Sequence, residues 1–206
     1  MIKKGSLHFN KEEQRRRKTE ALLKNAAMCF NQKGFSGTSL KDVSRNLEIT
    51  DAALYYYVKN KEELVNLCYI RALDLGEIAL NRAMDEGTNC LEKLQLYIRY
   101  QIEEVCGEDG PVAILSEIPS LKPEHQKYIL DRSTKHTKKV TKLLTDGIKE
   151  GTIYCSNPII SSDAILGALN WTPKWFKPES GITSTQIADS FIETFTGGLQ
   201  PRTPPI

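Results

Sequence analysis

In the first third of the chain, apolar residues recur every three or four positions, and this spacing predicts helices rather than strands. The first helix is predicted from about Lys11 to Lys33, and Gly34 follows it as a C-cap. Its apolar face comprises Leu22, Leu23, Ala26, Ala27 and Phe30.

Three shorter helices are predicted next, and each follows a residue that favours a helix N-cap. Ser39, with Asp42 three residues later, resembles a capping box and begins the second helix. Thr50 precedes the third helix and Asn60 precedes the fourth. The third helix is predicted from Asp51 to about Tyr56, and the fourth from Lys61 to roughly Met84.

The remainder of the chain keeps the helical spacing, which predicts an all-α fold of about nine helices and no strand. Glycine and proline mark the breaks between these helices, and the tail at 201–206 is predicted to be disordered. The expected helices are Cys90–Val105, a short one from Pro111 to near Ile118, one from Lys122 to Glu150, Ser161–Trp175, and Ser184–Leu199.

Two short helices joined by a tight turn and braced by a longer helix predict a helix-turn-helix. The alternative is three small helices that pack only for stability. Charge favours the first interpretation: residues 1–64 hold 13 Lys and Arg against 8 Asp and Glu, whereas the remainder has an acidic excess. The basic part is therefore expected to meet a polyanion such as DNA.

Composition narrows the class further. Hydrophobic residues make up 40% of the 206, with no long apolar run, so no membrane contact is expected. The basic N-terminus lacks the apolar core of a secretory signal. Five scattered cysteines without a C-x-x-C pair favour a reducing cytoplasm and disfavour a metal site.

The stretch GTSLKDVSRNLEITDAALYYYVKNKEEL closely resembles the N-terminal domain of TetR-type transcriptional repressors. The resemblance covers residues 15–64; beyond them only the number and length of the helices match. It implies a DNA-binding domain at 1–64 and a ligand-binding and dimerisation domain at 65–200. It also implies a homodimer that binds a palindromic operator in double-stranded DNA.

The same resemblance implies where DNA is contacted. Tyr55 and Tyr57 match phosphate-contacting positions and Tyr56 a groove-facing position, while Lys61 opens a helix whose N–H groups favour an anion. The first turn of the recognition helix reaches base edges, with its base preference left open. The predicted DNA-binding residues are Ser39, Lys41, Arg45, Thr50, Asp51, Ala52, Ala53, Tyr55, Tyr56, Tyr57 and Lys61. The basic run at 15–18 is either a solvated helix start or a further DNA contact.

A ligand-responsive repressor needs an effector pocket, and polar side chains beside apolar stripes are candidates for its wall. The alternatives are a wet helix face and, for the tryptophans, a place in the core or a subunit interface. The predicted ligand-binding residues are Tyr97, Gln101, Ser133, Thr137, Trp171 and Trp175.

The stretch GALNWTPKWF and the residues after it resemble TetR-like proteins that respond to acyl-CoA thioesters of lipid or sterol breakdown. Four lysines are candidate cations for the phosphates of an acyl-CoA ligand, or they simply form a solvated helix face. They are Lys135, Lys138, Lys139 and Lys142. Dimerisation is expected through the last two helices, and the fourth helix is expected to transmit ligand binding to the DNA-binding domain.

Two other functions are compatible with a helical protein of this kind. One is a TetR-type regulator of an efflux system that responds to hydrophobic drugs; another is a helical adaptor without DNA binding. No nucleophile, zinc-protease or phosphate-binding loop motif is present, and the three histidines are dispersed, so neither an enzyme nor a cofactor is expected.

Overall fold

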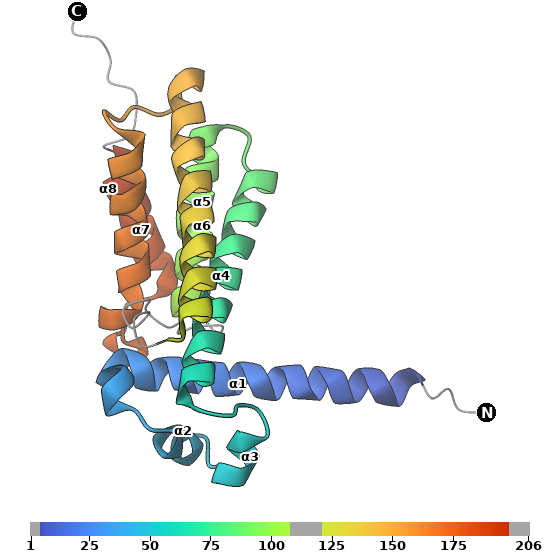
Figure 1. Cartoon of the computed structure of the whole chain (residues 1–206). Helices are drawn as coiled ribbons and strands as arrows, with labels where there is room; N and C mark the ends of the chain where they lie inside the picture. The colour runs from blue at the N-terminus through green and yellow to red at the C-terminus, as the bar shows by residue number, and fades with distance from the viewer. Residues whose placement is uncertain (1–4, 108–120, 198–206) are drawn as a thin grey trace, which may run out of the picture.

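The computed structural model describes residues 5–107 and 121–197. Over these ranges the fold contains eight α-helices and a short 3₁₀ helix, with no strand, as the spacing predicted. Figure 1 shows α1 lying across the lower end of an upright bundle formed by α4 to α8, with α2 and α3 below α1. The expected helix from Pro111 and the tail at 201–206 lie outside the described residues.

Helix α1 (Gly5–Gly37) begins earlier than expected, and its regular part ends at Gly34, as predicted. Gly34, predicted to end it, has φ 70° and kinks the helix, and one further turn follows. Beyond the kink, the buried Thr38 hydroxyl donates to the carbonyl groups of Cys29 (3.1 Å) and Gly34 (2.9 Å). These bonds fix the direction in which the chain leaves α1.

The two short helices are α2 (Leu40–Asn46) and α3 (Asp51–Tyr55). The turn between them contains Glu48, whose φ of 55° is in the left-handed region that non-glycine residues rarely adopt. Val43 and Leu54 are fully buried, so the pair packs against α1 through its apolar side.

The upright bundle consists of longer helices, and most bounds agree with the expected ones. Helix α7 begins three residues earlier than predicted because the Asn157 side chain accepts from the N–H groups of Ile159 and Ile160, and Pro158 occupies the first turn. The bundle contains α4 (Lys61–Glu86), α5 (Cys90–Cys106), α6 (Pro123–Glu150), α7 (Pro158–Trp175), η2 (Pro178–Ser180) and α8 (Ser184–Gly197).

Two clusters of buried side chains hold the molecule together. The lower one joins α1, α2, α3 and the first turns of α4, and it also receives Leu121 and Ile129 from the start of α6. The upper one joins the rest of α4 with α5, α6, α7 and α8. Because α4 contributes to both clusters, any change in its tilt affects both.

Within the described ranges, no helix is both long enough and apolar enough to cross a bilayer.

Candidate functional site

The first turn of α2 is fixed by the predicted capping box. The Asp42 N–H donates to Ser39 Oγ at 3.1 Å, and the Ser39 N–H donates to Asp42 Oδ2 at 2.9 Å. The Ser39 hydroxyl also donates to that carboxylate, and these bonds lower the pKa of Asp42. Ser39 is exposed, so its oxygen lies at the surface although it already serves as a cap.

The turn and the start of α3 are linked by side chains. The buried Ser44 hydroxyl of α2 donates to Asp51 Oδ1, and Thr50 Oγ1 accepts from the Ala53 N–H at 3.2 Å. One oxygen of Asp51, predicted to reach a base edge, is therefore engaged within the protein. Thr50, Asp51 and Ala52 are exposed and Ala53 is half-buried, so the first turn of α3 faces outward.

The tyrosines that follow have three different environments. Tyr55 is 56% exposed and Tyr56 72% exposed, whereas Tyr57 is half-buried and packs against the lower core. The rings of Tyr56 and Tyr57 meet edge to face with 5.3 Å between centroids. Tyr57 thus supports Tyr56, and the two exposed phenols are the ones available to a partner.

Lys61, which is predicted to contact a phosphate, also makes contacts within the protein. Its Nζ donates to the carbonyl groups of Phe35 (2.7 Å) and Thr38 (3.0 Å), and it lies 4.0 Å from the Phe35 ring centroid. Two of its three N–H groups are therefore used to join the first turn of α4 to the end of α1. A contact across 26 positions of sequence was not visible in the local pattern.

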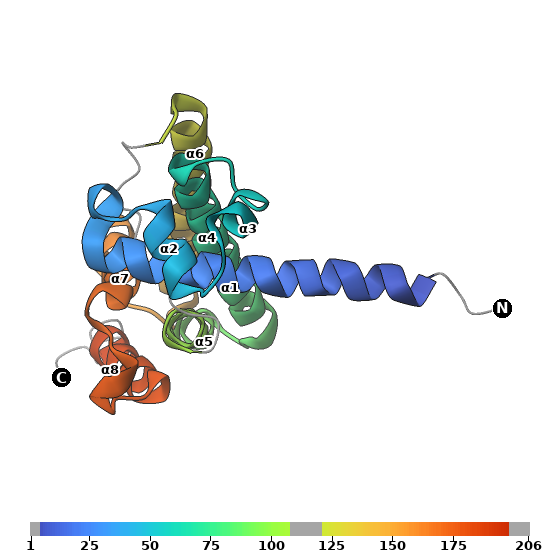
Figure 2. The ribbon, with the colours of Figure 1, turned by 90° about the horizontal axis from the view of Figure 1, so that it is seen from below.

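Two further predicted cations lie on α2. Lys41 and Arg45 are exposed, and Arg45 Nη1 lies 3.6 Å from an Asp42 carboxylate oxygen. The helix that carries them, α2, lies beside α3 on the near side of α1 in Figure 2, which views the molecule from below.

The six predicted effector residues fall into three separate places. Tyr97 and Gln101 lie one turn apart on α5 and are 1% and 5% exposed. The Tyr97 hydroxyl lies 2.8 Å from Nε2 of His136 on α6, a residue that the predicted set did not include. Burial raises the pKa of Tyr97 well above its usual value and lowers the pKa of His136, so both groups are neutral near pH 7.

Gln101 completes this interior group. Its Oε1 atom is buried and has no hydrogen-bond partner among the described residues. A Cβ placed on Gly76 of α4 would lie 3.4 Å from Oε1 and 3.8 Å from the His136 ring. A methyl group there would make only ordinary van der Waals contacts, so the interior group holds a buried acceptor without a donor beside a glycine.

The other four predicted residues lie outside this interior group. Ser133 and Thr137 line a groove of about 750 Å³ between α6 and α7, together with Ile159 and Asp163. Trp171 and Trp175 lie on the surface of α7, at 54% and 44% exposed. The helical periodicity placed these side chains on the correct helices but did not reveal which neighbour each helix face meets.

Another hollow, of about 500 Å³, lies between α4, α5 and α6. Apolar side chains such as Leu80 and Met84 form part of its wall, and four lysines surround it. Lys139 and Lys142 are paired with Glu77 and Asp146, so the cations are partly neutralised. The lysines are Lys93, Lys139, Lys142 and Lys149.

Polar contacts connect α1 and the first turn of α4 to α6 and α7. His125 Nδ1 of α6 lies 2.6 Å from Glu62 of α4, and the Lys174 Nζ of α7 donates to the Asn31 carbonyl of α1 at 2.8 Å. Burial alone would raise the pKa of Glu62, but the hydrogen bonds from His125 and the Lys122 N–H outweigh it and lower the pKa. These contacts can transmit a shift of α6 or α7 to α1 and α4.

The sequence matches known families along most of its length. Residues 22–68 match the family model described as bacterial regulatory proteins, tetR family. Residues 87–199 match the one described as the tetracyclin repressor-like C-terminal domain.

Individual relatives are similar over nearly the whole chain. The HTH-type transcriptional repressor KstR2 of Mycobacterium tuberculosis (strain ATCC 25618 / H37Rv) is 24% identical over 184 residues, covering 86% of this chain and 90% of its own. The KstR2 of Rhodococcus jostii (strain RHA1) is 23% identical, covering 89% and 91%.

Solved structures of TetR-type regulators are also similar to this chain over most of its length. The structure of the ketosteroid transcriptional regulator KstR2 of Mycobacterium tuberculosis has a TM-score of 0.77 at 25% identity, covering 90% of this chain and 96% of its own. The structure of AibR in complex with isovaleryl coenzyme A and operator DNA has a TM-score of 0.70 at 29% identity, covering 85% and 96%.

Proposed function

Because this chain belongs to the TetR family of bacterial regulatory proteins, we propose that it is a ligand-responsive transcriptional repressor that binds a palindromic operator as a homodimer. The observation that supports this best is the capped pair α2 and α3, whose outward face with exposed Tyr55 and Tyr56 lies at one end of the molecule. A twofold dimer presents two such faces to two half-sites.

Within this proposal the chain divides into residues 1–64 for DNA binding and 65–200 for effector binding and dimerisation. Lys41, Arg45, Tyr55 and Tyr56 contact phosphates or the groove, since they are exposed. The hydroxyls of Ser39 and Thr50 add contacts at helix N-termini. Lys61 holds α4 on α1, which places the phosphate-binding surface correctly.

For the effector we propose an acyl-CoA thioester. AibR was solved with isovaleryl coenzyme A, and the fold around Tyr97, Gln101 and His136 offers polar contacts inside an apolar core. The lysines around the hollow between α4, α5 and α6 suit the phosphates of such a ligand. The relatives described above are not named for drug efflux, so that alternative is not favoured.

The family consists of regulators rather than enzymes, and we propose that this chain acts without catalysis, in the cytoplasm. The apolar surface of α7 is the proposed subunit interface, continuing onto α8. Trp175 packs on Phe191 of α8 with 6.4 Å between ring centroids, so the two helices present one joint surface.

The test is selection of genomic fragments by the purified protein, followed by footprinting with and without a panel of acyl-CoA thioesters. A protected palindrome that one thioester releases is the expected result. If the protein protects a palindrome but no thioester releases it, the acyl-CoA proposal is wrong and the proposed regulatory function stands. If no DNA fragment is selected even at low salt, the proposed regulatory function is wrong, and a helical adaptor without DNA binding is favoured.

A further inference from the structure

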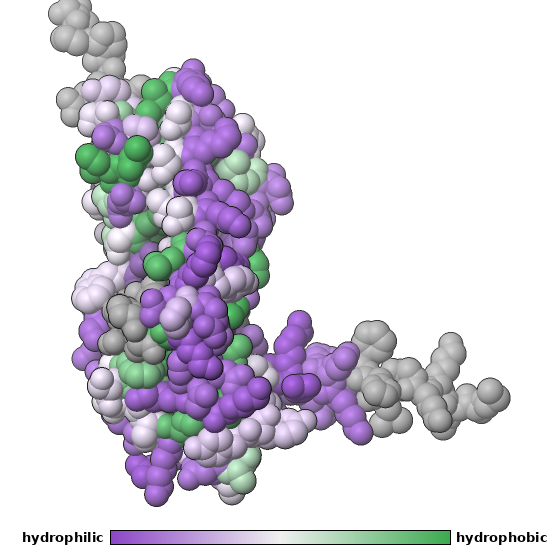
Figure 3. Space-filling view, viewed as in Figure 1, coloured by the Kyte–Doolittle hydropathy of each residue, from purple (hydrophilic) through white to green (hydrophobic). Residues whose placement is uncertain are grey.

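Helix α1 extends well beyond the part of it that packs. It has 33 residues, and Figures 1 and 2 show its N-terminal half projecting past α3, away from α7. All residues from 11 to 18 are exposed. Figure 3 shows the described part of this projection covered by hydrophilic side chains.

The cations of this segment are not spread evenly around the helix. At about 100° per residue, Lys11, Arg15 and Lys18 lie within about 60° of one another. The same stripe continues through Leu22 and Cys29, which are both buried. We call Lys11, Arg15 and Lys18 the cationic stripe.

The direction of the stripe is given by Cys29. Its Sγ atom accepts a hydrogen bond from Asn46 Nδ2 of α2 at 3.2 Å. The stripe therefore points to the side of α1 on which α2 and α3 lie, which is the side proposed to face DNA.

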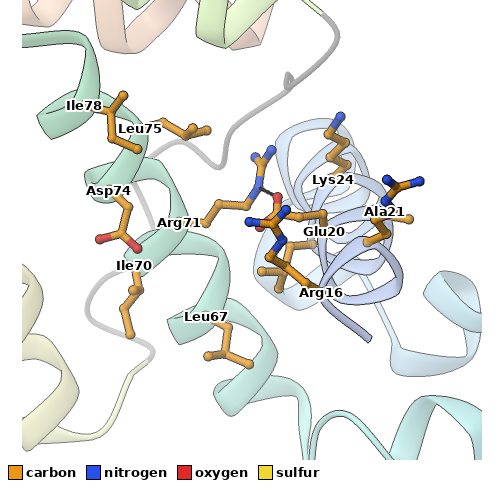
Figure 4. Close-up of a pocket in the computed structure, with 12 residues that line it drawn as sticks. Arg16, Glu20, Ala21, Lys24, Leu67, Ile70, Arg71, Asp74, Leu75 and Ile78 are labelled. Atoms are coloured by element: carbon orange, nitrogen blue, oxygen red, sulfur yellow. Dashed lines mark hydrogen bonds and ion pairs between the residues drawn. The ribbon is translucent and has the colours of Figure 1, made fainter. Parts of the chain in front are cut away.

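The opposite face of α1 is turned toward α4. Figure 4 shows Arg16, Glu20 and Lys24 along a groove of about 710 Å³ between the two helices, where Arg71 Nε donates to Glu20 at 2.6 Å. The acid Glu13 pairs with Arg17 at 2.6 Å, and it too lies away from the stripe. Acidic and basic side chains thus mix on this face, whereas the stripe contains only cations.

We propose that the cationic stripe binds phosphates of the DNA that flanks each operator half-site, outside the bases that α3 contacts. The inference rests on the proposed function, since α2 and α3 must first bring the helix to DNA. The C-terminal part of α1 lies against α7, the proposed subunit interface, where Lys174 bonds Asn31, and so the N-terminal part points away from the twofold axis.

The length of the cationic stripe determines how many phosphates it can contact and so how much it adds to DNA affinity. Seven residues of helix span about 10 Å, which matches roughly three phosphates along one strand. Lysine and arginine contacts to phosphate position a protein without reading sequence. The stripe therefore adds sequence-independent affinity and makes binding depend on the length of the duplex.

The experiment compares two variants with equal loss of charge. The test variant has Lys11→Gln, Arg15→Gln and Lys18→Gln; the matched control has Arg16→Gln, Arg17→Gln and Lys24→Gln on the other side of the helix. Glutamine is a good helix former, and circular dichroism verifies the helix content. Each protein is titrated with the selected operator, either cut at the palindrome or extended by about 10 base pairs on each side, at several salt concentrations.

The wild-type protein and the control are expected to bind the extended duplex more tightly and with a steeper salt dependence. The test variant is expected to bind both duplexes alike, with the log–log salt slope lowered by up to about 2.7 per protomer. Equal salt slopes for the wild type and the test variant on the extended duplex would overturn the proposed role of the stripe. An equally large decrease of the salt slope in the control variant would overturn it too. Failure of the wild type to bind either duplex would instead refute the proposed function.

Discussion

At the scale of single residues, the run Tyr55–Tyr57 shows how three identical side chains divide their roles. Helix α3 ends at Tyr55, and the other two tyrosines lie in the turn that follows, so the three rings point in different directions. Tyr57 packs on the lower core and on the edge of Tyr56, and the other two phenols remain at the surface. Their exposure is explained if they donate hydrogen bonds to DNA phosphates.

Removing either exposed hydroxyl should weaken DNA binding without unfolding the protein. Tyr55→Phe and Tyr56→Phe are each expected to cost about 1.5 kcal/mol, or roughly tenfold in operator affinity, because a hydrogen bond to a charged oxygen is lost. Fluorescence anisotropy with labelled operator measures the change. Tyr154→Phe, on the 47% exposed tyrosine after α6, serves as the control. Unchanged affinity in both variants would contradict the contact.

His136 makes stability depend on pH. Burial lowers its pKa to about 4, from about 6.5 in the unfolded chain; nearby Lys139 and Arg132 also lower it, against Glu77. Between these values the unfolded chain binds a proton that the folded protein does not. The contribution of neutral His136 to the free energy of unfolding is therefore complete above about pH 6.5. It falls by up to about 1.4 kcal/mol per pH unit as pH decreases toward 4.

Replacing this histidine should flatten that dependence. His136→Gln removes the titrating group and keeps an amide to meet the Tyr97 hydroxyl. Urea unfolding at half-unit steps from pH 4 to 7 is expected to show a shallower slope than in the wild type. Thr137→Ala, one position along, should keep the wild-type slope, and an identical slope in His136→Gln would refute the assignment.

At the scale of elements, the start of α4 is a structural joint. Lys61 bonds two carbonyl groups at the end of α1, while Asn60 caps the helix by accepting from the Glu63 N–H at 2.8 Å. The bound ammonium also lies where the negative end of α1 favours a cation. This joint sets the angle between α1 and α4.

Loss of the Lys61 charge should therefore lower stability more than a phosphate contact would. Lys61→Met is expected to reduce the free energy of unfolding by about 2 kcal/mol, because the two carbonyl groups lose a charged donor. Lys59→Met, on an exposed lysine two positions earlier, should stay within about 0.5 kcal/mol of the wild type. Chemical unfolding measures the stability of both variants. Unchanged stability of Lys61→Met together with a reduced salt slope in DNA binding would show that Lys61 is a phosphate contact instead.

Local signals in the sequence were enough to predict most elements. The caps Ser39, Thr50 and Asn60 are single residues with a short-range chemical preference, and all three are found in place. The earlier start of α7 was also signalled, by Asn157 and Pro158, but the apolar spacing alone suggested a later one. Short-range patterns therefore predicted helices well and their ends less well.

Contacts between distant elements could not be predicted this way. Periodicity placed Tyr97 and Thr137 near apolar stripes, but only packing shows that the first is interior and the second faces α7. The same holds for Lys61, whose partners lie 26 and 23 positions away. A side chain's helix follows from spacing, whereas its partner depends on the angles between helices.

At the scale of the whole molecule, α7 leaves a large apolar surface uncovered. Ile159, Ile160 and Trp171 are 61%, 66% and 54% exposed, and a Cβ on Gly167 would meet nothing within 4 Å. Hydrophobic side chains gather near the upper end of α7 in Figure 3. Exposed apolar surface of this kind is typical of a subunit interface.

A charge at this surface should separate the protomers. Trp171→Arg is expected to shift sedimentation from dimer to monomer at micromolar concentration and to weaken operator binding by at least tenfold, since one protomer engages only one half-site. Leu130→Arg introduces the same charge at a side chain on α6 that is 50% exposed, and it should remain dimeric. A dimeric Trp171→Arg would place the interface elsewhere.

The length of α4 has a mechanical consequence. From Lys61 to Glu86 the helix is a rod of about 38 Å. If its upper end is held by the effector core, a tilt of about 5° moves its lower end by about 3 Å, and the twofold axis doubles that change between the two protomers. Adjacent half-sites on B-DNA repeat about every 34 Å, with little tolerance for such an error. A small change in the tilt of α4 is thus amplified, by leverage alone, into a mismatch with the pitch of the double helix.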